Sequence, residues 1–295
     1  MPRIPYIYKK FRDSTWTIIQ VANEILEEYI EQGFDLTLRQ LYYQFVARDI
    51  LPNTEQSYNN LGNIINNSRL AGLTDWEYIV DRTRNIRKNP HWDSPAEIVK
   101  GCSEQFMIDK WINQENRIEV WIEKDALVGV ISGICHQLDI PYFSCRGYTS
   151  QSEMWSASQR LIKWEKEGYN TYILHLGDHD PSGIDMTRDI EDRLHLFRSR
   201  VEIKRIALNM DQIERYSPPP NPAKVTDSRA PDYVSKYGIF SWELDALEPR
   251  DIVDLIRNNV SPLCDQNLWD EKKAIEDEGR ALLSEMADSM YMEED

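Results

Sequence analysis

Residues 117–131 read RIEVWIEKDALVGVI, and residues 171–186 read TYILHLGDHDPSGIDM. Each segment opens with a short apolar run that predicts a buried strand, and each passes through acidic residues into a helical pattern. Residues 141–145 and 201–208 are also strand-like, with a predicted helix at residues 152–166 between them. This alternation of strands and helices predicts a parallel α/β sheet.

Three acidic residues follow the two quoted strands. Glu123 comes directly after the first, and Asp178 and Asp180 lie in the loop after the second. Ligands of open parallel sheets bind at the carboxyl ends of the strands, so we expect the three carboxylates to meet at one edge. Hard oxygen ligands of this kind suit Mg²⁺, with Mn²⁺ as a possible substitute. The alternative is structural, because Asp180 also precedes a predicted helix start and could simply cap it.

The N-terminal part has a different pattern. Helical periodicity covers residues 14–32, a segment from about residue 37, and residues 57–73, and a strand-like segment follows at residues 76–83. Three helices and a strand in this order predict a winged helix, a fold that often binds nucleic acid. The predicted fold class is therefore α/β, or α+β overall. We expect a winged-helix domain at residues 1–115 and a parallel-sheet domain with a helical, acidic C-terminal extension at residues 116–295.

The net charge of −16 does not by itself favour a nucleic acid ligand. However, residues 241–295 hold 16 Asp or Glu against 5 Lys or Arg, so most of the excess lies in that stretch and the remainder is nearly balanced. We expect the acidic stretch to be either a solvated surface or a shield over a basic groove. DNA therefore remains a possible partner.

Three motifs of the second part resemble a known family. VWIEKDALVGVI at residues 120–131, CRGYTS at 145–150 and HLGDHDPSGIDM at 175–186 are similar to the signature elements of the TOPRIM domain, and WELDAL at 242–247 is similar to a later segment. The form is that of the topoisomerase VI A subunit and its meiotic double-strand-break relative, and the match covers about residues 117–250. The resemblance implies a Rossmann-like TOPRIM domain that cleaves duplex DNA. It also implies that Glu123, Asp178 and Asp180 bind the catalytic Mg²⁺. Lys124 is then either a contact of these acids or of a phosphate, or a surface lysine.

The sequence RQLYY at residues 39–43 extends this resemblance to the N-terminal part. Those A subunits carry an Arg-x-x-Tyr-Tyr element whose second tyrosine attacks DNA, which here is Tyr43. On a helix, Arg39 and Tyr43 lie four residues apart and are expected to point together away from the apolar face, leaving Tyr42 in the core and Tyr43 free. Arg39 would activate the phenol and grip the scissile phosphate, with the acids of a partner subunit completing the site. This mechanism implies a homodimer and a 5′-phosphotyrosyl link, whereas a packing role is the alternative for Tyr43.

Further basic residues could contact the phosphate backbone, although a solvated surface is an equally open interpretation. These candidates are Arg69, Arg82, Arg84, Arg87, Lys88 and Arg146.

The sequence contains no GxxxxGK element, so a complete ATP-driven topoisomerase is not expected. A separate ATPase subunit could be a partner, or the chain could act alone. Three functions stay open: a tyrosine transesterase, a TOPRIM nuclease that activates water, and a DNA-binding protein without activity. The N-terminus lacks a secretory signal, and no run reaches the roughly 20 apolar residues of a membrane helix. We therefore expect a cytoplasmic, nucleoid-associated protein that does not enter a membrane.

Overall fold

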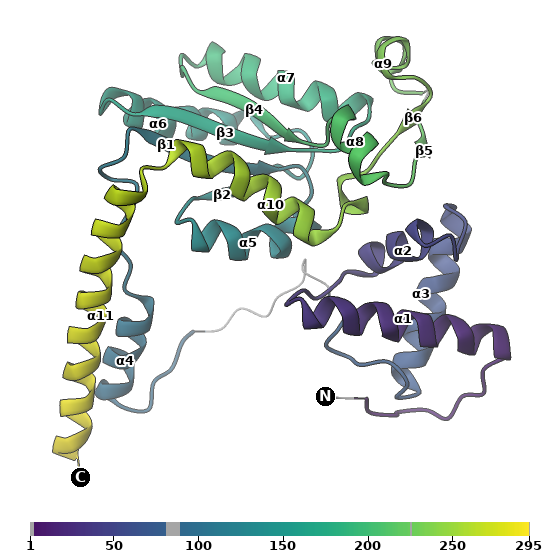
Figure 1. Cartoon of the computed structure of the whole chain (residues 1–295), viewed down its shortest axis with the longest axis horizontal. Coiled ribbons are helices and arrows are strands. Elements are labelled where there is room, and N and C mark those ends of the chain that lie inside the picture. The colour runs from purple at the N-terminus through teal and green to yellow at the C-terminus, as the bar shows by residue number, and fades with distance from the viewer. Residues whose placement is uncertain (1–2, 81–88, 225, 295) are drawn as a thin grey trace.

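The computed structural model describes residues 3–80, 89–224 and 226–294. It contains a parallel sheet covered by helices, a group of N-terminal helices, and a two-helix arm (Figure 1). The α-helices are α1 Asp13–Glu31, α2 Leu38–Ala47, α3 Glu55–Leu70, α4 Pro95–Gln105, α5 Val128–Gln137, α6 Gln151–Lys166, α7 Pro181–Leu196, α8 Met210–Tyr216, α9 Ala230–Tyr237, α10 Pro249–Val260 and α11 Gln266–Glu294. The strands are β1 Asn116–Ile122, β2 Tyr142–Ser144, β3 Asn170–Leu176, β4 Glu202–Ala207, β5 Asn221–Pro222 and β6 Phe240–Ser241, and the short 3-10 helices are η1 Asp125–Leu127, η2 Leu244–Ala246 and η3 Ser261–Leu263.

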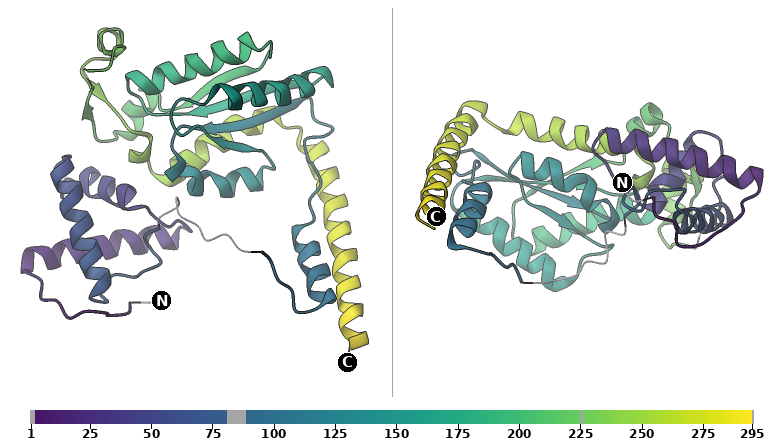
Figure 2. Two further views of the ribbon diagram at one scale, coloured as in Figure 1. Left: turned by 180° about the vertical axis from the view of Figure 1, so that it is seen from behind. Right: turned by 90° about the horizontal axis from the view of Figure 1, so that it is seen from below.

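Strands β1 to β4 form one sheet in the order β2-β1-β3-β4, with all neighbours parallel. The α/β class predicted from the sequence is therefore confirmed. Successive side chains of a strand point to opposite faces of the sheet. Val120 packs in a cluster with α5 and α10, whereas the next residue, Trp121, packs in another with α6 and α7. The sheet is thus the middle layer of three, with α5 and α10 on one face and α6 and α7 on the other (Figures 1 and 2).

The N-terminal helices form their own apolar cluster, to which Ile25, Leu41, Phe45 and Leu61 contribute. Thr37 caps α2 with a capping box, as expected for the helix start predicted near this residue. Within residues 3–80 the structure has helices and isolated bridges but no longer strand; one bridge joins Leu36 to Ile79. The predicted strand at 76–83 is thus absent from its described part, residues 76–80, and the winged helix stays a prediction.

The segment around η2 joins the N-terminal helices to the sheet. Ala246 of η2 is buried in the apolar cluster of the N-terminal helices, and η2 packs against α2. The hydroxyl of Tyr29 in α1 also donates a hydrogen bond to Glu248. Because η2 follows directly after β6 and Trp242, the same segment reaches from the sheet edge to α2.

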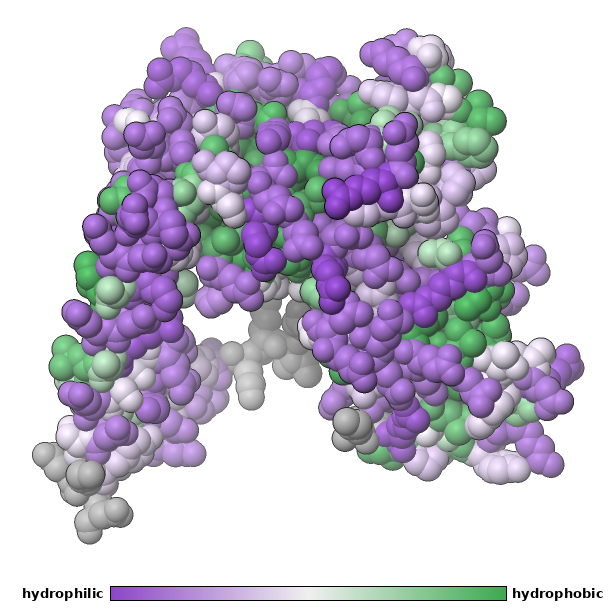
Figure 3. Space-filling model, viewed as in Figure 1, coloured by the Kyte–Doolittle hydropathy of each residue, from purple (hydrophilic) through white to green (hydrophobic). Residues whose placement is uncertain are grey.

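Helices α4 and α11 pack along each other and form an arm that projects from the sheet (Figures 1 and 2). Its base contains the buried ion pair between Lys110 and Glu276, with 2.5 Å between Nζ and Oε2. The face of α11 seen in Figure 3 is mainly hydrophilic. The acidic C-terminal helix predicted from the sequence is confirmed. No helix in the described part of the chain is both long and apolar enough to cross a membrane.

Candidate functional site

The register of the sheet brings the predicted acidic residues together. Strands β1 and β3 are paired from Asn116↔Asn170 to Ile122↔Leu176, so they end at the same level. Glu123 and the loop that begins at Gly177 therefore leave the sheet side by side. The backbone N–H of Asp178 donates to Glu123 Oε2 at 2.9 Å. The convergence expected from the sequence is found for Glu123 and Asp178.

Two features of the chain hold the loop of residues 177–180 in a fixed shape. Arg205, on β4, donates to the carbonyl oxygens of Gly177 and Asp178 at 2.9 and 2.6 Å, and to that of Gly183 at 2.9 Å. Gly183, in the first turn of α7, lies so close to the loop that a Cβ there would be 2.2 Å from the Asp178 carbonyl oxygen. The shape of the loop thus depends on the hydrogen bonds from Arg205 and on the absence of a side chain at Gly183.

The histidine of this loop is enclosed by aromatic rings. His179 is only 2 % exposed, and its ring lies in edge contact with Tyr233, Tyr237 and Trp242. Its Nδ1 is 2.8 Å from the Tyr233 hydroxyl, and its backbone pairs with that of Trp242. Burial lowers the pKa of His179 to about 4, so the ring is neutral at pH 7 and serves as packing within the loop.

Asp180 has the capping role that was the structural alternative. Its Oδ1 accepts from the backbone N–H of Gly183 at 2.6 Å and from the Ser182 hydroxyl at 2.9 Å, which makes it the N-cap of α7. Its charge nevertheless acts on the neighbouring acid, because it contributes to the raised pKa of Glu123. Asp180 therefore caps α7 and also acts electrostatically on Glu123.

Lys124 lies at the centre of a second group of acids. Its ammonium is 3.0 Å from Asp178 Oδ2 and 2.9 Å from Glu243 Oε2, and it also contacts Asp245. Burial lowers the pKa of Lys124, but the three carboxylates outweigh burial and hold it well above its ordinary value. Of the two interpretations of Lys124, the surface lysine is wrong, since its side chain is only 20 % exposed.

Burial dominates the electrostatics of the two central acids. It raises the pKa of Asp178 to about 7, with Glu123 and Asp245 adding to the rise while Lys124 opposes it. It also raises the pKa of Glu123, against the backbone N–H of Asp178 and the charge of Lys124. A cation near both would favour their charged forms, because opposite charges lower carboxyl pKa values.

The donor set of the three acids fits a hard divalent cation such as Mg²⁺, since it consists of carboxylate oxygens at a sheet edge. Across residues 3–80, 89–224 and 226–294, no three His, Cys, Asp or Glu side chains stand ready as a metal-binding group. The contacts explain this arrangement: Lys124 faces Asp178, and Asp180 caps α7. Glu123, Asp178 and Asp180 would thus hold the ion only after the side chains of Asp178 and Asp180 change rotamer.

Tyr43 is not free, contrary to the expectation from its position on the helix. It is 4 % exposed, as is Tyr42, and packs in the cluster of the N-terminal helices. The helical pattern did not predict this burial, because it does not report that η2 packs against α2. Its hydroxyl interacts with Glu243 and Asn221, and burial together with the charge of Glu243 raises the pKa of Tyr43.

Arg39 does point toward the same group as Tyr43, as expected. Its Nη1 lies 2.9 Å from Glu243 Oε2, and its side chain is 49 % exposed. The carboxylate of Glu243 therefore contacts Arg39 and Tyr43 from α2 on one side and Lys124 from the sheet edge on the other. All of these contacts lie within one chain.

A pocket of about 670 Å³ opens between the N-terminal helices and the sheet edge. Its lining includes five residues that the sequence singled out, namely Arg39, Arg69, Glu123, Lys124 and Arg146, together with Asp125 and Asp245. None of the described residues that line it belongs to α11. Instead, Glu243 and Asp245, from the start of the same acidic stretch, lie among its cations.

The other predicted basic residues differ in how accessible their side chains are to a ligand. Arg146 is 73 % exposed and pairs with Asp125 at 3.1 Å, so it can meet a ligand. Arg69 donates to the carbonyl oxygen of Ile79 at 3.2 Å and stacks on Trp76. Its side chain therefore mainly stabilises the backbone of residues 76–79. Four further candidates, Arg82, Arg84, Arg87 and Lys88, lie outside the described residues.

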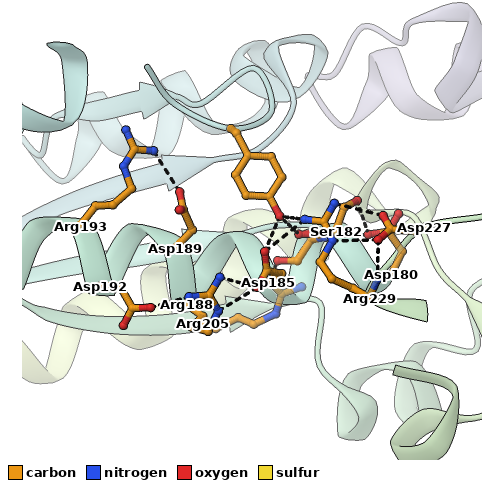
Figure 4. A network of polar contacts seen from close by, with 12 residues as sticks. Asp180, Ser182, Asp185, Arg188, Asp189, Asp192, Arg193, Arg205, Asp227 and Arg229 are labelled. Carbon is orange, nitrogen blue, oxygen red and sulfur yellow. Dashed lines mark hydrogen bonds and ion pairs between the residues drawn. The ribbon is translucent and has the colours of Figure 1, made fainter. Parts of the chain in front are cut away.

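A polar network covers the side of α7 next to the acidic loop (Figure 4). Arg229 pairs with Asp227 at 2.8 Å and with Asp185 at 3.1 Å, and it also contacts the Tyr148 hydroxyl. Asp185 accepts a hydrogen bond from that hydroxyl at 2.7 Å. The network ties the loop at Tyr148 and the segment before α9 to the helix that Asp180 caps.

The sequence was also compared with known proteins. No family model and no curated protein matches this chain. Sequence reasoning missed Arg205, Glu243 and Asp245, and only the position of the last two inside WELDAL, a segment already noted for its resemblance, could have drawn attention to them.

Proposed function

We propose that this protein cleaves duplex DNA in a Mg²⁺-dependent reaction of the topoisomerase VI A-subunit type, with a TOPRIM-like sheet domain and a DNA-binding N-terminal domain. The observation that carries the proposal is the pocket in which Glu123 and Lys124 of the sheet edge face Arg39 of the N-terminal helices. Carboxylates for a divalent cation and cations for a phosphate thus share one opening. That combination suits phosphodiester chemistry.

The residues of the site divide into two roles. Glu123, Asp178 and Asp180 would hold Mg²⁺, which when bound supplies positive charge for the reacting phosphate and the leaving oxygen. Arg39, Lys124 and Arg146 would orient the DNA backbone through its phosphates. Duplex DNA is the proposed substrate, and the homodimer and a separate ATPase partner stay predictions of the family resemblance.

Tyr43 is the proposed nucleophile. Its hydroxyl oxygen would form a bond to phosphorus while the bond from phosphorus to the 3′ oxygen breaks, which leaves a 5′-phosphotyrosyl link and a free 3′ hydroxyl. The phenolic proton would leave in the same step, and the 3′ oxygen would gain one. The contacts run from Tyr43 through Glu243 and Lys124 to Asp178 of the same chain, whereas the family resemblance implies that the acids of a partner subunit act with Tyr43.

A hydrolytic nuclease is the second candidate, and the burial of Tyr43 favours it. A hydroxyl on a 4 % exposed side chain, with its pKa raised, is a poor nucleophile until it is released. In this route a water attacks the phosphate and Tyr43 only packs. The acids and the basic residues keep the same roles.

Incubation of supercoiled plasmid with Mg²⁺, followed by detergent with or without protease, tests the proposal. Tyrosine transesterification predicts cleaved DNA that enters the gel only after protease, and loss of cleavage in Tyr43→Phe and Asp178→Asn. Cleavage that survives Tyr43→Phe and needs no protease would replace the tyrosine route with hydrolysis. Tight DNA binding without any cleavage in Mg²⁺ or Mn²⁺ would leave the third function, a DNA-binding protein without activity.

A further inference from the structure

Glu243 occupies the position between the two cations that are proposed to receive a phosphate. Its Oε2 lies 2.9 Å from Arg39 Nη1 and 2.9 Å from Lys124 Nζ, so one carboxylate oxygen bridges the N-terminal helices and the sheet edge. The pKa of Glu243 is lowered although burial opposes this, because the charges of Lys124 and Arg39 outweigh it. The group is therefore an anion held by two cations, as a phosphate oxygen would be.

The backbone fixes Glu243 in this place from both sides. Trp242 exchanges two backbone hydrogen bonds with His179, at 2.8 and 2.9 Å. On the other side, the backbone N–H of Leu244 donates to Asp178 Oδ1 at 2.8 Å. The backbone on both sides of Glu243 is thus hydrogen-bonded to the acidic loop. These bonds keep the residue next to Arg39 and Lys124.

Lys124 and Arg39 differ in the ion pairs that they would keep if Glu243 were removed. Lys124 keeps its contacts with Asp178 and Asp245. Within the described residues, the only ion pair of Arg39 is with Glu243, and its half-exposed side chain lines the pocket. Removing the carboxylate would therefore release mainly Arg39 toward a ligand, and would also free the Tyr43 hydroxyl from its acidic neighbour.

We propose that Glu243 is an internal substitute for a DNA phosphate, which closes the site in the free protein and has to be displaced when a phosphodiester enters between Arg39 and Lys124. This inference rests on the proposed function and assigns a regulatory device to the same site. DNA binding would then also remove the acidic neighbour of the Tyr43 hydroxyl, since the same carboxylate contacts both Arg39 and Tyr43. A chain without DNA would then keep its nucleophile and its phosphate contact blocked.

Binding of a fluorescent DNA duplex in EDTA, measured by anisotropy over a range of salt concentrations, tests this substitution role without relying on activity. Glu243→Gln preserves the size of the side chain and removes its charge. The slope of log K against log salt reports the number of phosphate contacts, about 0.9 for each, and this number is the same once a phosphate has displaced Glu243. Glu243→Gln therefore predicts an unchanged slope and binding roughly 3- to 10-fold tighter, because no carboxylate has to be displaced. The gain should vanish in the double variant Arg39→Gln, Glu243→Gln, because the released cation is then missing.

Glu28→Gln is a matched control. It removes one negative charge and frees Arg48, at the C-terminal end of the helix that carries Arg39, because Glu28 Oε2 pairs with Arg48 Nη2 at 2.7 Å; neither residue lines the pocket. We expect this control to bind DNA as the unaltered protein does. Equal gains for Glu28→Gln and Glu243→Gln would show a general charge effect and overturn the inference, as would unchanged or weaker binding by Glu243→Gln.

Pyrophosphate separates failure of this inference from failure of the proposed function. If no variant binds DNA, DNA cleavage is excluded, but calorimetric titration with pyrophosphate in EDTA still examines the anion position. Tighter pyrophosphate binding by Glu243→Gln than by the unaltered protein would support the internal substitute. Equal or weaker binding would refute it, and an unchanged urea midpoint would show that the variant is folded.

Discussion

Replacing Gly183 by alanine directly tests the shape of the acidic loop. A Cβ at this position would be 2.2 Å from the carbonyl oxygen of Asp178, whereas real Cβ atoms essentially never approach closer than 3.0 Å. The first turn of α7 and the loop would therefore have to separate by about 0.8 Å. The oxygen belongs to the backbone and is held by Arg205 at 2.6 Å, so it cannot turn aside as a flexible side chain would.

The expected loss of stability follows from this contact. Overpacking of a well-packed interior reduces the free energy of unfolding by about 1–3 kcal/mol, and a fixed backbone partner places Gly183→Ala in the upper half of that range. The displaced loop would also move Asp178 away from Glu123, so Mg²⁺ binding should weaken together with stability. Urea unfolding followed by tryptophan fluorescence measures the first effect, and calorimetry with MgCl₂ measures the second.

Gly133 supplies the matched control. It lies within α5, and a Cβ there would meet no heavy atom of the described residues within 4 Å. Gly133→Ala should therefore stabilise the protein by about 0.5–1 kcal/mol, because alanine loses less backbone entropy in a helix. If Gly183→Ala unfolds at the same urea concentration as the unaltered protein, the close packing of α7 on the acidic loop is refuted.

Two further predictions concern the arm and the acids. Lys110→Met removes the 2.5 Å partner of the buried Glu276, which keeps Arg280 at 3.0 Å, and should lower the free energy of unfolding by about 2 kcal/mol, whereas Lys273→Met, which breaks the exposed pair with Asp277, should leave it nearly unchanged; equal effects in urea unfolding would contradict the buried pair. Because the pKa of Asp178 is raised to about 7, this acid binds a proton below that pH, and Mg²⁺ affinity measured by calorimetry should be about tenfold weaker at pH 6 than at pH 8. An affinity independent of pH over this range would show that Asp178 does not bind the ion.

The sequence was sufficient to predict the sheet and its acidic edge, because strand periodicity and the position of acids after strands are local signals. Glu123 and Asp178 meet because β1 and β3 end in register, which follows from the apolar runs before them. Lys124 was left open between two roles, since its surroundings depend on Asp245, 121 residues further along the chain.

The position of Tyr43 could not be predicted in the same way. The sequence placed it beside Arg39 and outside the apolar face of Leu41 and Phe45, but the ring is buried and η2 packs against α2. Glu243 was missed for the same physical reason: its contacts with Arg39 and Lys124 span 204 and 119 residues, and no periodicity reports pairs so distant. The predicted strand at residues 76–83 is absent from residues 76–80, where Arg69 instead bonds to backbone carbonyls.

Iron-directed self-cleavage tests most directly the central claim, a divalent cation at the carboxyl ends of β1 and β3. Fe²⁺ can replace Mg²⁺ at oxygen sites, and with ascorbate and peroxide it generates radicals that cut the nearest backbone. A cation at this edge should give fragments that end close to Glu123 and Asp178, that are suppressed by excess Mg²⁺ and that are absent in Asp178→Asn. Cuts confined to the acidic helix α11, or cuts near the acidic loop that persist in Asp178→Asn, would contradict it.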